Sequence, residues 1–133
     1  MWHRVLIIGR WVVDFLFATK GYDDEAIIAF LYEFDASEEV MRRAVSIIES
    51  GRYNRGFTFA NPERMRALVV IGPTTSGKQF LNTFTHELRH LADAIARSLG
   101  HDLNEEAPAY LTGDATMALA EAVCELGCKD RCE

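Results

Sequence analysis

The chain alternates between apolar runs too short for helices and longer segments with an apolar residue at every third or fourth position. The short runs favour strands and lie at residues 5–8, 11–17, 57–59 and 67–71. The first two runs are expected to form one or two buried strands around Gly9-Arg10, and Asn61-Pro62-Glu63 favours a turn that pairs the last two. We therefore expect a small, mostly antiparallel sheet.

Two helices are expected between these pairs of strands. The first begins at Tyr22-Asp23-Asp24, with acidic residues in its first turn, and runs to about Phe34. Ser37 is expected to cap the second, and Gly51 closes it after Ser50. Their inward faces are expected to carry Ile27, Ile28, Leu31 and Phe34 in the first helix, and Val40, Val45, Ile47 and Ile48 in the second.

A longer helix follows Ser76, which is expected to cap it. Its stripe has the 3.6-residue period of a core face and consists of Phe80, Phe84, Leu88, Leu91, Ile95 and Leu99. After a break at Gly100-His101-Asp102, a final helix begins near Glu106. Its apolar face is expected to contain Tyr110, Gly113, Met117 and Cys124. Helices that pack against one small sheet define an α+β domain.

The composition favours a single domain over residues 1–133. The chain is 49 % hydrophobic and 26 % charged, which is typical of soluble globular proteins. Its net charge of −6 and its lack of a Lys/Arg cluster argue against nucleic-acid binding, because phosphate contacts need concentrated positive charge. Arg10 and Asp14 interrupt the most apolar stretch, residues 5–18. We therefore expect no secretion signal and no membrane span, and a cytoplasmic location.

The long helix contains His86-Glu87-Leu88-Arg89-His90, an H-E-x-x-H motif. Residues four apart lie one turn apart on the same face of a helix, so both imidazoles can bind one metal ion. Both histidines also lie nearly opposite the apolar stripe, which argues against two core histidines. Glu87 then lies beside the metal, where its carboxylate can accept a proton from water, as zinc hydrolases require. The alternative is an ordinary solvated helix face.

A zinc site of this kind needs a third protein ligand. Metzincins place a glycine and a third histidine soon after the motif, but position 96 is alanine, so that class is excluded. The other common solution is a glutamate from a following helix. Glu106 is the candidate, because a carboxylate that leads an apolar face is costly unless a positive charge meets it. Glu105 is the alternative, since Pro108 allows the helix to start a turn earlier or later.

The segment His86-Glu87-x-x-His90, followed by Glu106-x-x-Ala109-Tyr110, resembles the gluzincin pattern of zinc metallopeptidases. It is most similar to the minimal, single-domain gluzincin-like proteins of phages and mobile elements. The resemblance covers residues 80 to 117. It implies a zincin-like fold in which His86, His90 and Glu106 bind Zn²⁺ and Glu87 is the catalytic base.

Residues around the third ligand both match and depart from this pattern. In the gluzincin-like group, a small residue three positions after the ligand glutamate lets the two helices approach, and Ala109 matches it, whereas Glu105 is followed by Pro108. Thermolysin-type enzymes place an aspartate four positions after the glutamate to orient a ligand histidine, and this chain has Tyr110 there. Asp93 or Asp114 would then orient the histidine. Tyr110 is either an oxyanion donor or a packing residue.

Two other motifs have simpler interpretations. Residues 72–78, GPTTSGK, fit the G-x-x-x-x-G-K phosphate-binding pattern between an expected strand and a helix. Gln79 replaces the hydroxyl that would hold Mg²⁺, and no later strand ends in an acidic residue, so we interpret the segment as a turn. Cys124, Cys128 and Cys132 match no established zinc spacing, and we expect free thiols.

Together these features predict a zinc-dependent metallopeptidase that acts on a peptide or protein substrate. An edge strand beside the cleft would bind the substrate by strand addition. The alternative is a catalytically inactive zincin-like domain that binds metal or a protein partner. Glu87 favours the enzyme, because a purely structural metal site does not need a carboxylate that is neither a ligand nor on the core stripe.

Overall fold

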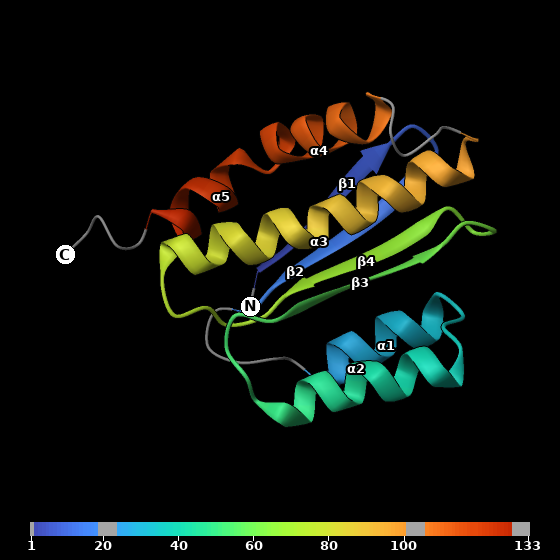
Figure 1. The fold of residues 1–133 in the computed structure, drawn as a ribbon. Helices are drawn as coiled ribbons and strands as arrows, with labels where there is room; N and C mark the ends of the chain where they lie inside the picture. The colour runs from blue at the N-terminus through green and yellow to red at the C-terminus, as the bar shows by residue number, and fades with distance from the viewer. Residues whose placement is uncertain (1, 19–23, 101–105, 129–133) are drawn as a thin grey trace.

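The computed structural model describes residues 2–18, 24–100 and 106–128, which form a four-stranded sheet with helices on both faces (Figure 1). The strands are β1 (Trp2–Ile8), β2 (Trp11–Phe17), β3 (Gly56–Asn61) and β4 (Arg66–Ile71). Their order in the sheet is β1-β2-β4-β3. The expected strands are therefore present, with two separate strands around Gly9-Arg10. β1 and β3 are the two edges, and β1 is mostly exposed instead of buried as expected, because no strand pairs with its outer side in the described sheet.

Two of the three strand pairings are antiparallel: β1 with β2, and β3 with β4 across the expected turn. The central pairing, β2 with β4, is parallel, so the sheet is mixed. The β1–β2 turn uses Gly9 at φ 60°, a left-handed conformation that glycine adopts without strain. The β3–β4 turn closes on Met65, whose amide donates to the Pro62 carbonyl at 3.2 Å.

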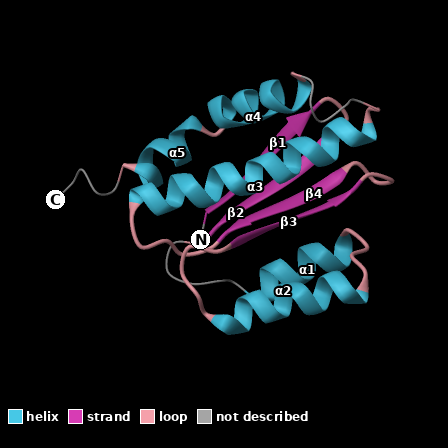
Figure 2. Ribbon diagram, viewed as in Figure 1, coloured by secondary structure: helices cyan, strands magenta, loops and turns pink. Residues whose placement is uncertain are grey.

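Helices cover the sheet unequally (Figure 2). The helices α1 (Asp24–Glu33) and α2 (Glu38–Ser50) lie on one face, and α3 (Gly77–Ser98), α4 (Ala107–Ala118) and α5 (Ala120–Gly127) lie on the other. No helix in these described ranges is both long and apolar enough to cross a membrane. The Tyr22-Asp23 start expected for the first helix lies outside the described residues.

The expected helix caps are present. The Ser37 hydroxyl accepts the Val40 amide at 3.3 Å, and Gly51 ends α2 at φ 60°. The Ser76 hydroxyl accepts the Gln79 amide at 3.1 Å at the start of α3. Each serine satisfies an amide that has no partner inside its helix.

Alternation along the strands divides the core into two clusters. Phe15 and Phe17 on β2 pack towards α3, whereas the intervening Leu16 packs towards α1. The α3 stripe is buried as expected at Phe80, Phe84, Leu88, Leu91 and Ile95.

Two expected core residues are exposed. Leu99 is 62 % exposed because α3 ends at Ser98, so the stripe stops with the helix. Val45 is 37 % exposed because Ala44 and Ile48 are the residues of α2 that face the sheet.

The apolar face expected for the last helix is also wrong. Tyr110 and Met117 are 67 % and 74 % exposed, whereas Ala115 and Leu119 are buried. The helix also breaks at Leu119, where α4 passes into α5. The stripe projected from Glu106 is therefore the solvent side of α4, not its packing side.

The polar residue that interrupts the apolar N-terminal stretch has partners. Asp14 is 4 % exposed. Its Oδ1 lies 2.7 Å from His3 Nε2, and its Oδ2 lies 3.4 Å from Arg66 Nη2. The Arg66 guanidinium also lies over the Phe34 ring at 4.5 Å. These contacts compensate a carboxylate that would otherwise be costly to bury in a sheet.

Candidate functional site

The middle of α3 lies close against the edge strand β3. A Cβ atom added to Gly56 would lie 2.5 Å from the Val70 carbonyl oxygen, 3.0 Å from Glu87 Cγ and 3.2 Å from Thr83 Cγ2. Any side chain at position 56 would therefore collide with both the sheet and the helix. The missing side chain of Gly56 is what lets this part of α3 approach the strand.

Alternation along β3 turns a hydroxyl towards the same part of α3. Phe57 and Phe59 pack with the α1–α2 cluster, so Thr58 between them faces α3. Thr58 Oγ1 lies 3.1 Å from the Glu87 carboxylate Oε1 and 3.1 Å from the Glu87 main-chain oxygen. The hydroxyl thus donates to Glu87 and fixes its position at the strand.

Glu87 is the one buried carboxylate of the motif and is only 5 % exposed. Burial raises its pKa above the ordinary value of 4.5, because the charged form loses water. The hydrogen bond from Thr58 and the neighbouring His86 and His90 act in the opposite direction and favour the carboxylate. Sequence analysis placed Glu87 away from the core stripe, and the structure shows that β3 covers it instead.

The two histidines converge at the surface. His86 Nε2 and His90 Nε2 are 3.1 Å apart, with ring centroids separated by 4.7 Å and planes at 82°. Two nitrogens that are each 2.0–2.1 Å from a tetrahedral zinc ion would lie roughly 3.3 Å apart. The spacing of the imidazoles is therefore close to that of two ligands of one metal ion. Glu87 Oε2 lies 4.0 Å from His86 Nε2.

A third protein ligand is not gathered at this pair. Within residues 2–18, 24–100 and 106–128, no three His, Cys, Asp or Glu side chains form a group that could hold a metal ion. Glu106 is exposed and directly precedes α4, which lies on the β1 side of α3, whereas the histidines border β3 (Figure 1). Its role as a ligand stays a prediction, and Glu105 lies outside the described residues.

The other residues assigned around the metal lie on α3, where Asp93 is one turn after His90, and on α4. Asp93 accepts a hydrogen bond from Arg89 Nε at 2.8 Å. Tyr110 and Asp114 occupy exposed positions of α4. Ala109, expected where the two helices approach, is also exposed, and the neighbouring Pro108 is buried instead.

Two adjoining hollows open beside the histidines. One has a volume of about 310 Å³ and is lined by Asn54, Arg55, Gly56, Asn82, Thr83, His86 and Glu87. The other has a volume of about 350 Å³ and is lined by Arg43, Ile47, Gly56, Phe57, Thr58, Ala60, His86, Glu87, His90 and Ala94. Both share Gly56, His86 and Glu87, so the motif lies in a groove along the β3 edge, between α2 and α3.

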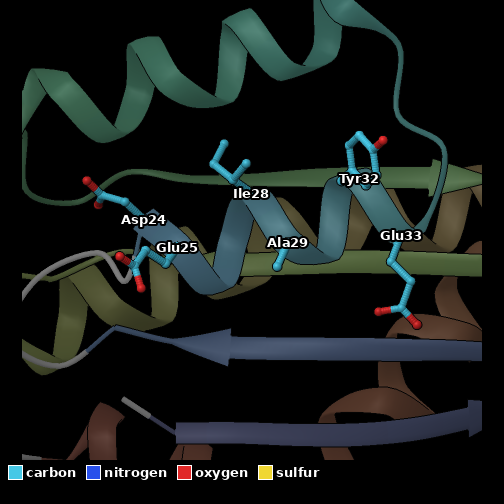
Figure 3. A pocket seen from close by; sticks show the side chains of 6 residues that line it. All are labelled: Asp24, Glu25, Ile28, Ala29, Tyr32 and Glu33. Atoms are coloured by element: carbon cyan, nitrogen blue, oxygen red, sulfur yellow. The ribbon is translucent and has the colours of Figure 1, made fainter.

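A larger hollow of about 720 Å³ lies on the opposite face of the sheet, along α1 (Figure 3). Ile28, Ala29 and Tyr32 form its apolar part, and Asp24, Glu25 and Glu33 add carboxylates along the same helix. Ile28 was expected in the core but is only half-buried here. None of the six residues that line this hollow also lines the two hollows beside the histidines.

The phosphate-loop segment is tied to the loop before β3. Asn54 Oδ1 accepts the Thr75 amide at 3.0 Å and lies 3.2 Å from the Thr75 hydroxyl. That amide is therefore engaged inside the protein instead of pointing at a phosphate. Cys124 and Cys128 are free thiols, and Cys132 lies outside the described residues.

Comparison with protein families, with curated proteins and with solved structures found no match for this chain.

Gly56 and Thr58 are the residues that sequence analysis missed. The signal for Thr58 was present: a lone hydroxyl between Phe57 and Phe59 in a strand must point to the face opposite the two rings. The signal for Gly56 was weaker, because a glycine before a strand is equally typical of a turn.

Proposed function

We propose that the chain is a zinc-dependent metallopeptidase with a zincin-like α+β domain. The observation that carries this proposal is the arrangement of the motif. Two imidazole nitrogens lie 3.1 Å apart at the groove surface, and a buried carboxylate lies 4.0 Å from one of them. An ordinary solvated helix face needs neither two convergent imidazoles nor a carboxylate that is held by a residue of a neighbouring strand.

His86 and His90 would hold the metal as neutral imidazoles, and Glu106 is the proposed third ligand. When bound, zinc supplies Lewis-acid chemistry that polarises a peptide carbonyl and lowers the pKa of water towards about 7. Imidazole nitrogens suit zinc better than they suit calcium or magnesium, which prefer oxygen ligands.

Glu87 is the proposed general base. Its raised pKa makes it a better proton acceptor than an exposed glutamate, because a base works best when its pKa lies near the working pH. Thr58 holds one carboxylate oxygen, Oε1, and leaves Oε2 on the side of His86. Glu87 would accept the proton of the attacking water and pass it to the leaving amine.

The position of β3 at the edge of the sheet favours a peptide as the substrate. Among the described residues β3 pairs only with β4, so its outer edge has backbone groups that an extended peptide can meet as an added strand. Gly56 and Thr58 bring this edge next to the histidines. A peptide aligned on β3 would therefore pass the metal ligands.

Zinc analysis of the tag-free protein and four variants tests the proposal. We expect stoichiometric zinc that is lost in His86→Ala, reduced in Glu106→Ala and retained in Glu87→Gln. We expect Glu87→Gln to lower the hydrolysis of a peptide mixture by about 10²–10⁴-fold. Lys78→Ala is the control and should change neither the zinc content nor the hydrolysis. We also expect the wild-type protein to bind no nucleotide. Wild-type protein without zinc, or Glu87→Gln with unchanged hydrolysis, would overturn the proposal.

One observation favours a second function, a zincin-like domain that binds metal or a protein without turnover. Within the described ranges, the histidines have no third ligand beside them. A two-histidine site would bind zinc weakly and would depend on a partner to complete it. In that case Glu87→Gln would match wild type in every hydrolytic assay, while His86→Ala would still lose metal.

A further inference from the structure

The groove beside the histidines continues past α2. A third hollow of about 240 Å³ is lined by Val40, Arg43, Ala44, Ile47, Phe57, Thr58, Phe59 and Ala60. It shares Arg43, Ile47, Phe57, Thr58 and Ala60 with the hollow that contains both histidines. The three hollows therefore form one groove along β3 from Gly56 to Ala60. α2 and α3 both line its middle, α3 alone faces β3 at the Asn54 end, and α2 alone faces it at the other end.

The lining of this groove contains two arginines and one glutamate, in a protein of net charge −6. Arg43 lines it from α2, and Arg55 lines its other end. Glu87 is the only carboxylate among the residues that line the three hollows, and Thr58 already engages it. Among the described residues no carboxylate forms an ion pair with Arg43, including Glu39 one turn earlier on α2.

The surface along α1 has the opposite sign. Its apolar hollow carries Asp24, Glu25 and Glu33 and no basic residue in its lining (Figure 3). An acidic ligand would be repelled there and attracted to the groove. The charge distribution thus separates the two surfaces by the kind of partner each can accept.

We infer that the β3 groove selects extended peptides that carry acidic side chains, and that Arg43 is the residue that recognises them. This inference rests on the proposed function, which makes a peptide the substrate, but it concerns how the peptide is bound and not how it is hydrolysed. A peptide added to β3 would lie about 4.8 Å from it, and its side chains would point alternately towards α2 and α3. Only every second side chain faces Arg43, so the acidic preference should apply to alternate positions.

Binding of labelled peptides to zinc-loaded Glu87→Gln tests the inference without turnover. The probes are ten-residue peptides with Glu, Gln or Lys at alternate positions, measured by fluorescence polarisation. We expect the Glu peptides to bind about two- to fivefold more tightly than the Gln peptides, because Arg43 is exposed and an ion pair screened by water is weak. Adding Arg43→Gln should abolish this preference, and Arg43→Glu should reverse it in favour of Lys.

Arg42→Glu is the matched control. It makes the same charge change at the preceding, exposed position of α2, which lines none of the three hollows. We expect it to leave the preference for Glu over Gln in place. Equal binding of the Glu and Gln peptides, or an equal loss with Arg42→Glu, would overturn the inference.

The same peptides separate this inference from the proposed function. If wild-type protein binds the Glu peptides selectively through Arg43 but cleaves none of them, the peptidase proposal fails and the groove assignment stands. If it cleaves peptides with no dependence on their charge or on Arg43, the groove assignment fails and the peptidase proposal stands.

Discussion

The two flanks of α3 bury side chains of opposite character. Ala92 and Ala96 are buried half a turn round the helix from Thr83 and Glu87. The alanines lie on the flank away from β3, on the side of α3 where α4 lies. The other flank meets β3 through a threonine and a glutamate, and only a glycine on the strand makes room for them. We therefore expect the α4 flank to contribute mainly to stability, whereas the β3 flank packs closely around the polar groups of the candidate site.

The largest effect is expected on the α4 flank. Leu119→Ala removes a side chain that is only 5 % exposed and should lower the free energy of unfolding by about 2–5 kcal/mol in urea denaturation. Met117→Ala, two residues earlier and 74 % exposed, should change it by no more than about 0.5 kcal/mol. Equal losses from the two variants would contradict the packing side that we assign to α4.

A substitution at Gly56 tests the β3 flank, and Gly113 on the solvent side of α4 is its control. Gly56→Ala should destabilise the protein by about 1–3 kcal/mol, because the added Cβ collides with Val70 and Glu87. Gly113→Ala in α4 meets nothing within 4 Å and should stabilise it by roughly 0.5–1 kcal/mol. Thermal unfolding of both variants is the measurement. A tolerated alanine at position 56 would show that β3 does not lie against α3.

Removing the hydroxyl between β3 and α3 should have an intermediate effect. Thr58→Val keeps the branched shape that suits a strand but leaves the Glu87 carboxylate without its donor, at a cost of about 1–3 kcal/mol. It should also raise the pKa of Glu87 further, because the Thr58 hydrogen bond is the largest of the influences that lower it. Thr58→Ser retains the hydroxyl and should keep most of the stability, which urea denaturation would show.

The smallest expected effect is the contribution of Glu87 to the pH dependence of stability in the metal-free protein. Burial raises the pKa of Glu87 above 4.5, so the folded state takes up a proton more readily than the unfolded state does. The stability that Glu87 contributes is thus fully present below about pH 4.5 and is lost as the pH rises through the raised pKa. In chelator, Glu87→Gln should be at least as stable as wild type at pH 7.

The comparison with wild type at low pH completes that prediction. Below pH 4.5 the glutamate is neutral in both states, so any advantage of Glu87→Gln should shrink or vanish there. A variant that is less stable than wild type at pH 7, with metal removed, would mean that the Glu87 carboxylate is stabilising and that its pKa is not raised.

Local patterns were sufficient to predict most of the elements. The turn between β3 and β4, the caps at Ser37 and Ser76 and the stripe from Phe80 to Ile95 all depend on residues close in sequence. The position of His86 and His90 on one exposed face follows from helical spacing alone. These predictions are confirmed because neighbouring residues decide them.

The polar side of the site could not be predicted in the same way. Thr58 and Glu87 are 29 residues apart, and their contact exists only because the sheet brings β3 under α3. In α4, apolar residues occur all round the helix, with Leu111 and Ala115 on one side and Tyr110 and Met117 on the other. The helical period of the apolar residues therefore does not show which side of α4 packs against the domain. The prediction of Glu106 as a ligand depended on knowing that side.

The exposed pair of imidazoles has a practical consequence at the bench. His86 retains 68 % of its side-chain exposure, and its Nε2 and that of His90 are close enough to share one ion. Nickel and copper also bind imidazole nitrogens well, as zinc does. The untagged chain should therefore be retained on a chelated-nickel resin and be released by imidazole, and His90→Ala should pass straight through. Preparations purified on such resin would carry leached nickel into any measurement of native metal content.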